Sequence, residues 1–268
     1  MPSVEPHRNK LIHKAHLHPF LARNPFSCPR TLGFFYREKM RAIHRIAPQT
    51  LRTSNAVSDR APPLLEIGGG RSGLTAMLYP QAEVVNVDLD PAFAESPCNR
   101  LPQVQFIVAD AVALPFADES FALVTMFDLL EHVADDNLAL REACRVPRPG
   151  GSLLISTPRE NWRYPYYSIL NGICPSEEEL FEEWGHVRRG YAKADLERLI
   201  SMPNTGWSSF ISPATVVCHD LAFSRLPKPA RVALCAAISP MTWIGYWSHR
   251  PHDEGAETAS AWQKAEVT

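Results

Sequence analysis

Residues 63–90 read PLLEIGGGRSGLTAMLYPQAEVVNVDLD, and this stretch decides the fold. A short apolar run is followed by Gly68, Gly70 and Gly73 at G-x-G-x-x-G spacing, a helical segment, a second apolar run and the acid Asp88. The first glycine allows a sharp turn, the second lets backbone approach a ligand, and the third lets helix and strand pack closely. A carboxylate that ends the second strand can accept hydrogen bonds from ribose hydroxyls. The stretch therefore predicts a strand, turn, helix and strand that bind an adenosine-containing ligand.

Three further apolar runs predict strands, at 104–109, 121–126 and 152–156. The first ends at Asp110, and the second leads into Asp128. A helix is expected over 135–146, where the glycines of PRPGG end it. Strands that alternate with helices predict a doubly wound α/β fold, with a mostly parallel sheet and helices on both faces. In such sheets ligands bind beyond the carboxyl ends of the strands, so the glycine turn and the three acids should share one rim.

The composition excludes several classes of protein. The chain has 268 residues, 45% hydrophobic content and a formal net charge of −2. No basic excess points to a nucleic-acid partner, and the apolar content suits one sizeable core. The six cysteines form no C-x-x-C pair, and the N-terminus has no continuous apolar segment, so we expect reduced thiols and a cytoplasmic protein.

Four segments in this order resemble the class I S-adenosylmethionine-dependent methyltransferases, and most of all the small-molecule group that includes the quinone-biosynthesis enzymes. They are LEIGGGRSG, VNVDLD, VADAVALPFADESFALVTMFDLLEHV and RVPRPGGSLLISTP, which together span about residues 63–158. The later EEWGHVRRGYAKADLERLI, at 182–200, is also similar to a segment that these enzymes place before their sixth strand. The resemblance implies a seven-stranded Rossmann-like sheet with its last strand antiparallel, and S-adenosylmethionine as the cofactor.

The resemblance also implies a set of cofactor-binding residues: Glu66, Gly68, Gly70, Gly73, Asp88, Leu89, Asp110, Ala111, Phe127 and Asp128. Glu66 and the glycine turn would hold the methionine part of the cofactor. Asp88 would bind the ribose hydroxyls, with Leu89 against the adenine.

The remaining members of the set would complete the adenine and methyl ends of the site. Asp110 would meet the adenine amino group, with Ala111 beside it, while Phe127 and Asp128 would line the crevice beside the transferable methyl. Each acid also has a structural alternative, because Asp88 and Asp128 could cap the segments that follow them and Asp110 could be a turn residue.

The acceptor side is expected in a long insertion at 159–190, which is rich in aromatic residues. His186 is the candidate general base, because histidine titrates near neutral pH; alternatively it satisfies loop backbone. No metal site is predicted. The histidines of the N-terminal arm, at 7, 13, 16 and 18, match no closed zinc set.

The two ends of the chain complete the expected organisation. Residues 1–48 form an irregular arm followed by a helix at 31–47, which is either a lid over the ligand or packed on the sheet edge. The methyltransferase domain spans 49–225. It closes with a helix at 192–201 and strands near 206–211 and 214–222. Residues 226–268 contain an apolar run and a polar tail at 251–268 that we expect to be disordered.

The apolar run at 230–247 has two interpretations. It is short for a spanning helix, and Pro240 interrupts it, but its Trp and Tyr residues are types favoured at a membrane interface. It is therefore either a helix buried against the domain or an anchor that makes peripheral contact at the inner membrane face.

We therefore expect a methyltransferase that acts on a small-molecule, lipid or glycan acceptor, including a lipid-linked one. Two alternatives stay open. A nicotinamide-dependent oxidoreductase would share the glycine turn and the ribose acid, and a non-catalytic protein would retain the cofactor-binding fold.

Overall fold

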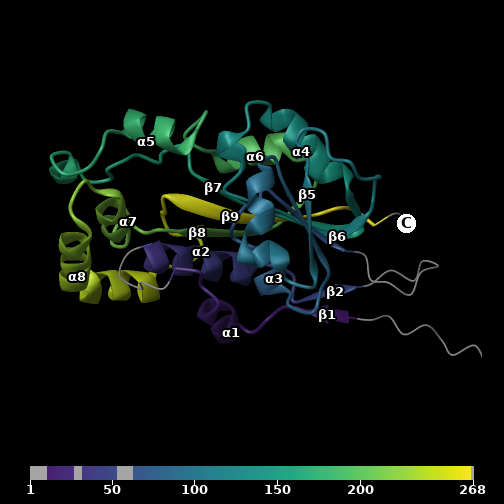
Figure 1. Ribbon diagram of the computed structural model, residues 1–268, viewed down its shortest axis with the longest axis horizontal. Coiled ribbons are helices and arrows are strands. Elements are labelled where there is room, and N and C mark those ends of the chain that lie inside the picture. The colour runs from purple at the N-terminus through teal and green to yellow at the C-terminus, as the bar shows by residue number, and fades with distance from the viewer. Residues whose placement is uncertain (1–10, 27–31, 53–62, 267–268) are drawn as a thin grey trace, which may run out of the picture.

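The computed structural model describes residues 11–26, 32–52 and 63–266, and its centre is a seven-stranded sheet (Figure 1). The strand order is β5-β4-β3-β6-β7-β9-β8. The strands from β5 to β7 in this order pair in parallel, and β9 runs antiparallel to both of its neighbours, β7 and β8. The strands are β3 (Leu64–Ile67), β4 (Val84–Asp88), β5 (Val104–Val108), β6 (Phe121–Phe127), β7 (Pro147–Pro158), β8 (Asn204–Phe210) and β9 (Glu257–Gln263). This arrangement confirms the predicted fold class, including the antiparallel strand.

Helices cover both faces of the sheet, because successive strand residues point to opposite sides. Leu64 packs with the core on the side of α2 and α3, whereas Leu65 packs with the core on the side of α4 and α6. The helices are α1 (Leu17–Ala22), α2 (Leu32–Ile46), α3 (Leu74–Leu78), α4 (Asp136–Arg145), α5 (Glu177–Trp184), α6 (Lys193–Leu199), α7 (Val216–Phe223) and α8 (Lys228–Ser248).

The last strand of the sheet lies elsewhere than the sequence predicted. Residues 216–223 form α7, and the polar tail supplies β9, which inserts between β7 and β8. Expecting a strand at 214–222 and disorder at 251–268 was therefore wrong. Small and polar side chains hid the strand: both of its faces are buried, with Ala259 and Ala261 in the core on one side of the sheet and Trp262 in the core on the other. Backbone pairing on both edges supplies the order that side-chain hydropathy does not indicate.

The N-terminal segment is also more regular than expected. The strands β1 (Leu11–His13) and β2 (Thr50–Arg52) pair antiparallel in a separate two-stranded sheet, and α1 follows β1. The helix predicted at 31–47 is present as α2. Residues 91–103, which lack apolar periodicity, contain the short 3-10 helices η1 (Pro91–Glu95) and η2 (Pro97–Arg100). Two more single-turn helices, η3 (Leu130–His132) and η4 (Ser168–Leu170), lie in the loops after β6 and β7.

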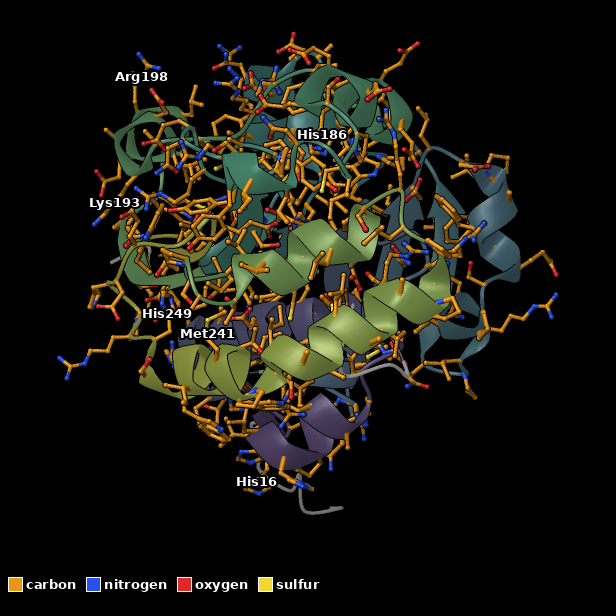
Figure 2. The ribbon with its side chains drawn as sticks, turned by 90° about the vertical axis from the view of Figure 1, so that its left-hand side faces the viewer. His16, His186, Lys193, Arg198, Met241 and His249 are labelled. Carbon is orange, nitrogen blue, oxygen red and sulfur yellow. The ribbon has the colours of Figure 1, made fainter. Side chains whose placement is uncertain are left out.

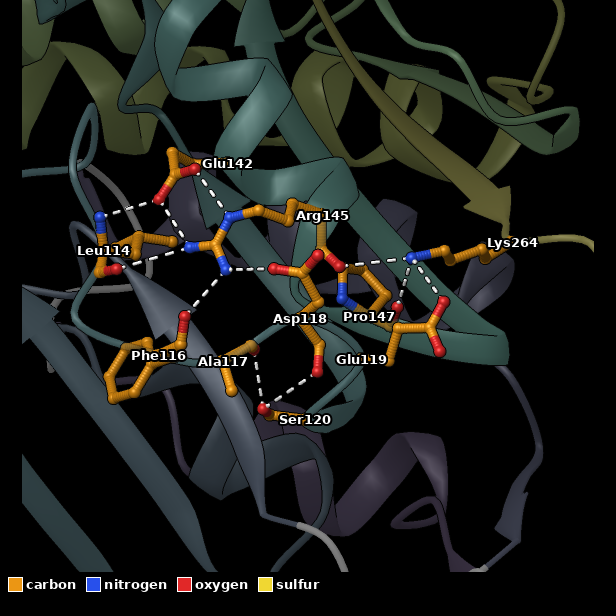
Figure 3. A network of polar contacts seen from close by, with 10 residues as sticks. All are labelled: Leu114, Phe116, Ala117, Asp118, Glu119, Ser120, Glu142, Arg145, Pro147 and Lys264. Carbon is orange, nitrogen blue, oxygen red and sulfur yellow. Dashed lines mark hydrogen bonds and ion pairs between the residues drawn. The ribbon is translucent and has the colours of Figure 1, made fainter.

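A polar network ties the end of β9 to the turn before β6 (Figure 3). Arg145 at the end of α4 donates to both oxygens of Glu142 at 2.7 Å and to Asp118 at 2.8 Å, and it also donates to the Phe116 carbonyl at 2.7 Å. Lys264, just past β9, donates to the Pro147 carbonyl at 2.9 Å. The network fixes the amino ends of β6 and β7, opposite the rim where the predicted site residues lie.

Candidate active site

The predicted cofactor residues lie at the carboxyl ends of four adjacent parallel strands. β3 pairs with β4 and β6, and β4 pairs with β5, so the segments that follow these strands meet at one edge of the sheet. The glycine turn follows β3, Asp88 ends β4, Asp110 follows β5 and Asp128 follows β6. The structure therefore brings together, on one rim, the groups that the sequence placed there.

The glycine turn needs glycine at all three predicted positions. Gly68, Gly70 and Gly73 have φ values of +70°, +46° and +58°, which residues with a side chain rarely adopt. A Cβ on Gly68 would lie 2.6 Å from the Leu129 side chain, and one on Gly73 would lie 2.5 Å from Cβ of Cys98. The third glycine thus permits close packing against η2.

Glu66 is a buried carboxylate that holds the start of α3. It accepts hydrogen bonds from the backbone N–H groups of Leu74 and Thr75, both at 3.2 Å. Burial raises the pKa of Glu66 to about 7, although these hydrogen bonds oppose the shift. In this structure its contacts stabilise the turn, and a direct contact with the methionine part of a cofactor stays a prediction.

Asp88 connects the end of β4 to the glycine turn. One carboxylate oxygen accepts from Gly70 N–H at 3.0 Å, and the other accepts from Asp90 N–H at 3.2 Å. The cap of the following η1 is Asp90, whose side chain accepts from Ala92 N–H. Leu89 is 68% exposed on this rim, so its side chain is accessible to a ligand. Asp88 is therefore fixed at the turn, and its half-buried carboxylate keeps further acceptor capacity for hydroxyl groups.

The residues after β5 and β6 differ in how strongly they are held. Asp110 is exposed, and its side chain accepts from Val112 N–H at 3.1 Å, which is the turn geometry given above as its alternative. Ala111 beside it is half-buried, and Phe127 is buried at the end of β6. Asp128 has a left-handed backbone with φ of +48° and accepts from Ser156 Oγ at 2.6 Å. It caps no helix, because the cap of α4 is Asp135.

Lys39 on α2 is a site residue that the sequence did not indicate. Its buried ammonium forms an ion pair with Asp128, and the carboxylates of Glu257, Glu131 and Glu66 act on it electrostatically. Tyr36, one turn earlier on α2, is buried, and burial and the Glu66 carboxylate raise its pKa. Both predicted roles of this helix therefore have support, because α2 packs against β8 and β9 and also extends Tyr36 and Lys39 over the rim. In the sequence, Lys39 is only a lysine within an amphipathic helix, and this pattern does not indicate a site.

Several buried acids gather at this end of the sheet. Burial raises the pKa of Glu131 to about 7 and that of Glu257 to about 8, although Lys39 favours the charged form of both. Glu257, at the start of β9, has one carboxylate oxygen without a hydrogen-bond partner in the described part of the chain. The buried Lys39 thus faces several carboxyl groups that are partly protonated near neutral pH, and a cationic ligand would favour their ionised form.

His186 lies in an aromatic cluster formed by the insertion at 159–190. Its ring is 6.3 Å from Trp162, 5.3 Å from Phe181 and 5.5 Å from Trp184, measured between ring centroids. Burial, and to a lesser extent His132, lower the pKa of His186 to about 4. The imidazole is therefore neutral at neutral pH and a weak base, and its catalytic role stays a prediction.

One group of metal-type side chains is present among the described residues, and it lies beside this cluster. Glu131, His132 and His186 each offer one ligand atom, and these atoms all lie within 4.8 Å of one another. This group was not predicted from the sequence, because His186 is more than fifty residues from the adjacent Glu131 and His132. Of the histidines in the N-terminal arm, those at 13, 16 and 18 belong to no such group, and the one at 7 lies outside the described residues.

Comparisons with known proteins agree with this geometry. Residues 65–155 match the family model of a methyltransferase domain. A ubiquinone/menaquinone biosynthesis C-methyltransferase of Hahella chejuensis is 37% identical over 123 residues, which cover 42% of this chain and 49% of that protein. The chain thus spans about half the length of the curated relatives it matches.

Two solved structures share the fold over nearly the whole chain. A methyltransferase in complex with a methyltransferase activator from Haloferax volcanii has a TM-score of 0.51 and 16% identity, with 92% of this chain and 98% of that chain covered. A [4+2]-cyclase has a TM-score of 0.55 and 17% identity, with 94% and 92% covered. The glycine turn, Asp88, Asp110 and Asp128 all lie within residues 65–155, the part of the chain that matches the methyltransferase-domain model.

Proposed function

We propose that the protein transfers a methyl group from S-adenosylmethionine to a small-molecule acceptor. The observation that carries this proposal is the rim itself, where the glycine turn, Asp88, Asp110 and Asp128 follow four adjacent parallel strands. The sulfonium of the cofactor is cationic, and the buried carboxyl groups around Lys39 suit a positive ligand. Transfer is an in-line displacement, so the protein mainly aligns acceptor, methyl and sulfur, which can supply roughly 7–11 kcal/mol.

The fold alone does not decide the reaction, since a [4+2]-cyclase has a similar one. The proposal therefore rests on cofactor choice, and calorimetry with S-adenosylmethionine and with NAD tests it directly. We expect binding of S-adenosylmethionine and none of NAD. The reverse result would contradict the proposal and favour an oxidoreductase. If the cofactor binds, the non-catalytic alternative survives only if a labelled-methyl screen of small molecules and lipid fractions yields no product.

Replacing Asp88 by Ala tests the ribose role within the same experiment. The loss of hydrogen bonds to a charged acceptor costs about 1.5–3 kcal/mol, so the cofactor Kd should rise by roughly 10- to 100-fold. Asp90→Ala is the matched control, because it removes an acid two residues away that caps η1 instead of contacting the glycine turn. If the two substitutions changed the Kd equally, the proposed contact of Asp88 with the ribose would be wrong.

We also propose that α8 brings the enzyme to a membrane surface, where a lipid acceptor would be available. No helix among the described residues has the length and apolar character needed to cross a membrane. The outward face of α8 is nevertheless apolar, with Leu234, Met241, Ile244 and Trp247 exposed by 43%, 46%, 69% and 71%. The other face, with Cys235 and Tyr246, is buried, so both interpretations of the apolar run apply to one helix (Figure 2).

Charge and residue type support a lipid occupant of this face. The segment between Arg231 and Arg250 contains no acidic residue, and Lys228 begins the helix. Basic ends and an exposed Trp suit the headgroup region of an anionic membrane. Pro240 lies inside α8 on this exposed side, and the helix continues through it.

Co-sedimentation with phosphatidylserine-containing vesicles tests the membrane proposal. The double variant Ile244→Glu, Trp247→Glu should lose vesicle binding, because charges then replace the most exposed apolar side chains. Leu101→Glu is the control, since that exposed leucine lies outside α8, shortly before β5. Vesicle binding that both variants retain equally would exclude α8 as the contact.

A further inference from the structure

Three side chains beside the acceptor end of the rim form a cluster with metal-binding chemistry. Glu131 and His132 lie in η3, directly after β6, and His186 follows α5. One carboxylate oxygen and two imidazole nitrogens from these residues lie within 4.8 Å of one another. The two imidazole rings are 4.7 Å apart between centroids and nearly perpendicular, at 85°.

The fold holds the two segments of this cluster together. Gly185 ends α5 in the left-handed conformation, with φ of +70°, and so directs the chain back toward η3. Val187 N–H then donates to the Glu131 carbonyl at 2.9 Å. Arg188 donates to the Leu130 and Val133 carbonyls, both at 2.6 Å. One backbone hydrogen bond and two hydrogen bonds from the Arg188 side chain therefore hold the segment that carries His186 against η3.

Neighbouring groups orient the ligand atoms as in known metal sites. Nδ1 of His132 lies 3.3 Å from the Gly185 carbonyl, so Nδ1 carries the proton and Nε2 keeps its lone pair. The buried Glu131 carboxylate accepts from Thr157 Oγ1 at 3.4 Å. Metal-binding histidines commonly donate their other N–H to a carbonyl, and ligating carboxylates are commonly hydrogen-bonded in turn.

His186 supplies an independent observation. Its Nδ1 is buried and has no hydrogen-bond partner within the described residues, although burying an unpaired polar atom is costly. The aromatic rings of Trp162, Phe181 and Trp184 surround the imidazole and offer no strong acceptor or donor at that atom. A cation held with Glu131 and His132 and coordinated by Nδ1 would give this buried atom a partner, although the ring as a whole is only half-buried.

We propose that Glu131, His132 and His186 bind one divalent transition-metal ion beside the acceptor site. Two imidazoles and one carboxylate suit zinc or another first-row ion and leave coordination positions open. The positive charges of Lys39 and Arg188 act on Glu131 and oppose a cation, so coordination by the three side chains would have to hold the ion.

The ion would act on the acceptor, a role that rests on the proposed methyl transfer. It would coordinate an acceptor hydroxyl and lower its pKa, and the proton would pass to water. The hydroxyl oxygen then bonds to the methyl carbon, the carbon–sulfur bond breaks, and sulfur keeps the electron pair as a neutral thioether. His186 would then hold the ion instead of serving as a free general base.

Titration of the chelator-treated full chain with Co²⁺ tests the site without any turnover. We expect one equivalent to bind and to give visible d–d absorption without a thiolate charge-transfer band, which separates this site from the buried cysteines. His186→Ala and His132→Ala should each weaken binding by about 10- to 100-fold. His16→Ala, an exposed histidine at the other end of the view in Figure 2, should change nothing.

The outcomes separate the two proposals. No saturable Co²⁺ binding, or binding that both cluster variants retain, overturns the metal site, provided that the variants keep the wild-type melting transition. If one variant fails to fold, the other decides. Calorimetry with S-adenosylmethionine on the metal-free protein tests the cofactor independently. Methyl transfer that a chelator leaves unchanged but that His186→Ala abolishes would restore the general-base role and contradict the metal.

Discussion

Arg145 shows how one side chain can hold a turn that has no regular structure of its own. It joins Glu142, Asp118 and the Phe116 carbonyl, and the charged partners raise its pKa (Figure 3). Arg145→Met keeps most of the side-chain length but removes these bonds, so the free energy of unfolding should fall by about 1.5–3 kcal/mol. Urea denaturation measures this. The control Arg198→Met, which loses an exposed pair with Asp195, should change it by less than about 0.5 kcal/mol.

Glu38 gives a prediction about pH at the same scale. Burial raises its pKa from 4.5 to about 8, against the opposing effects of the Thr215 hydroxyl and Arg41. The folded state therefore holds this proton more tightly than the unfolded state, so stability falls as pH rises from about 4.5 to 8. Glu38→Gln keeps the shape and carries no charge. We compare the free energies of unfolding of the variant and the wild type. The difference should favour the variant more at pH 8 than at pH 5, by about 1 kcal/mol or more.

Thermal or urea unfolding of both proteins at pH 5 and pH 8 measures the difference. Glu178→Gln removes the charge of an exposed acid on α5 and serves as the control. A Glu38→Gln variant whose stability falls with pH as steeply as that of the wild type would show that Glu38 ionises as readily in the folded state as in solution.

Among the elements, β9 is the strand that joins β8 to the rest of the sheet. It pairs with β7 over residues 152–158 and with β8 along its other edge. Truncation after residue 256 should abolish cooperative unfolding, because it exposes both strand edges and removes the buried Trp262. Truncation after residue 264 keeps β9 and Lys264, so it should leave the melting transition nearly unchanged. Circular dichroism during heating distinguishes the two, and a normal transition in the shorter protein would contradict this role.

For the whole molecule, the strands β3 to β7 were predictable from the sequence, whereas β9 and α7 were not. Strands β3 to β7 have apolar runs whose lengths and spacing indicate them directly, and glycines and acids mark their ends. In contrast, β9 consists of ETASAWQ, where alternation is weak and order comes from pairing with both neighbours. Residues 216–223 are apolar except for His219 and Asp220, and such a short apolar run is shared by strands and buried helices.

The site divides along the same line. Residues that follow their own strand, such as Asp88 and Asp128, could be placed from the sequence. Lys39 and the cluster of Glu131 with His186 could not, because only the tertiary fold brings α2 and the insertion to the rim. The sequence shows which functional groups are present, and contacts between distant segments decide which of these groups lie at the site.

The position of β9 also has a consequence for the order in which the chain is made. Ribosomes release the polypeptide from its N-terminus, so β3 to β7 can assemble while later residues are still being synthesised. β8 cannot join them by itself, because β9 is its partner and lies between it and β7. Until residues 257–263 emerge, β7 presents an unpaired edge, which is open to pairing with another chain.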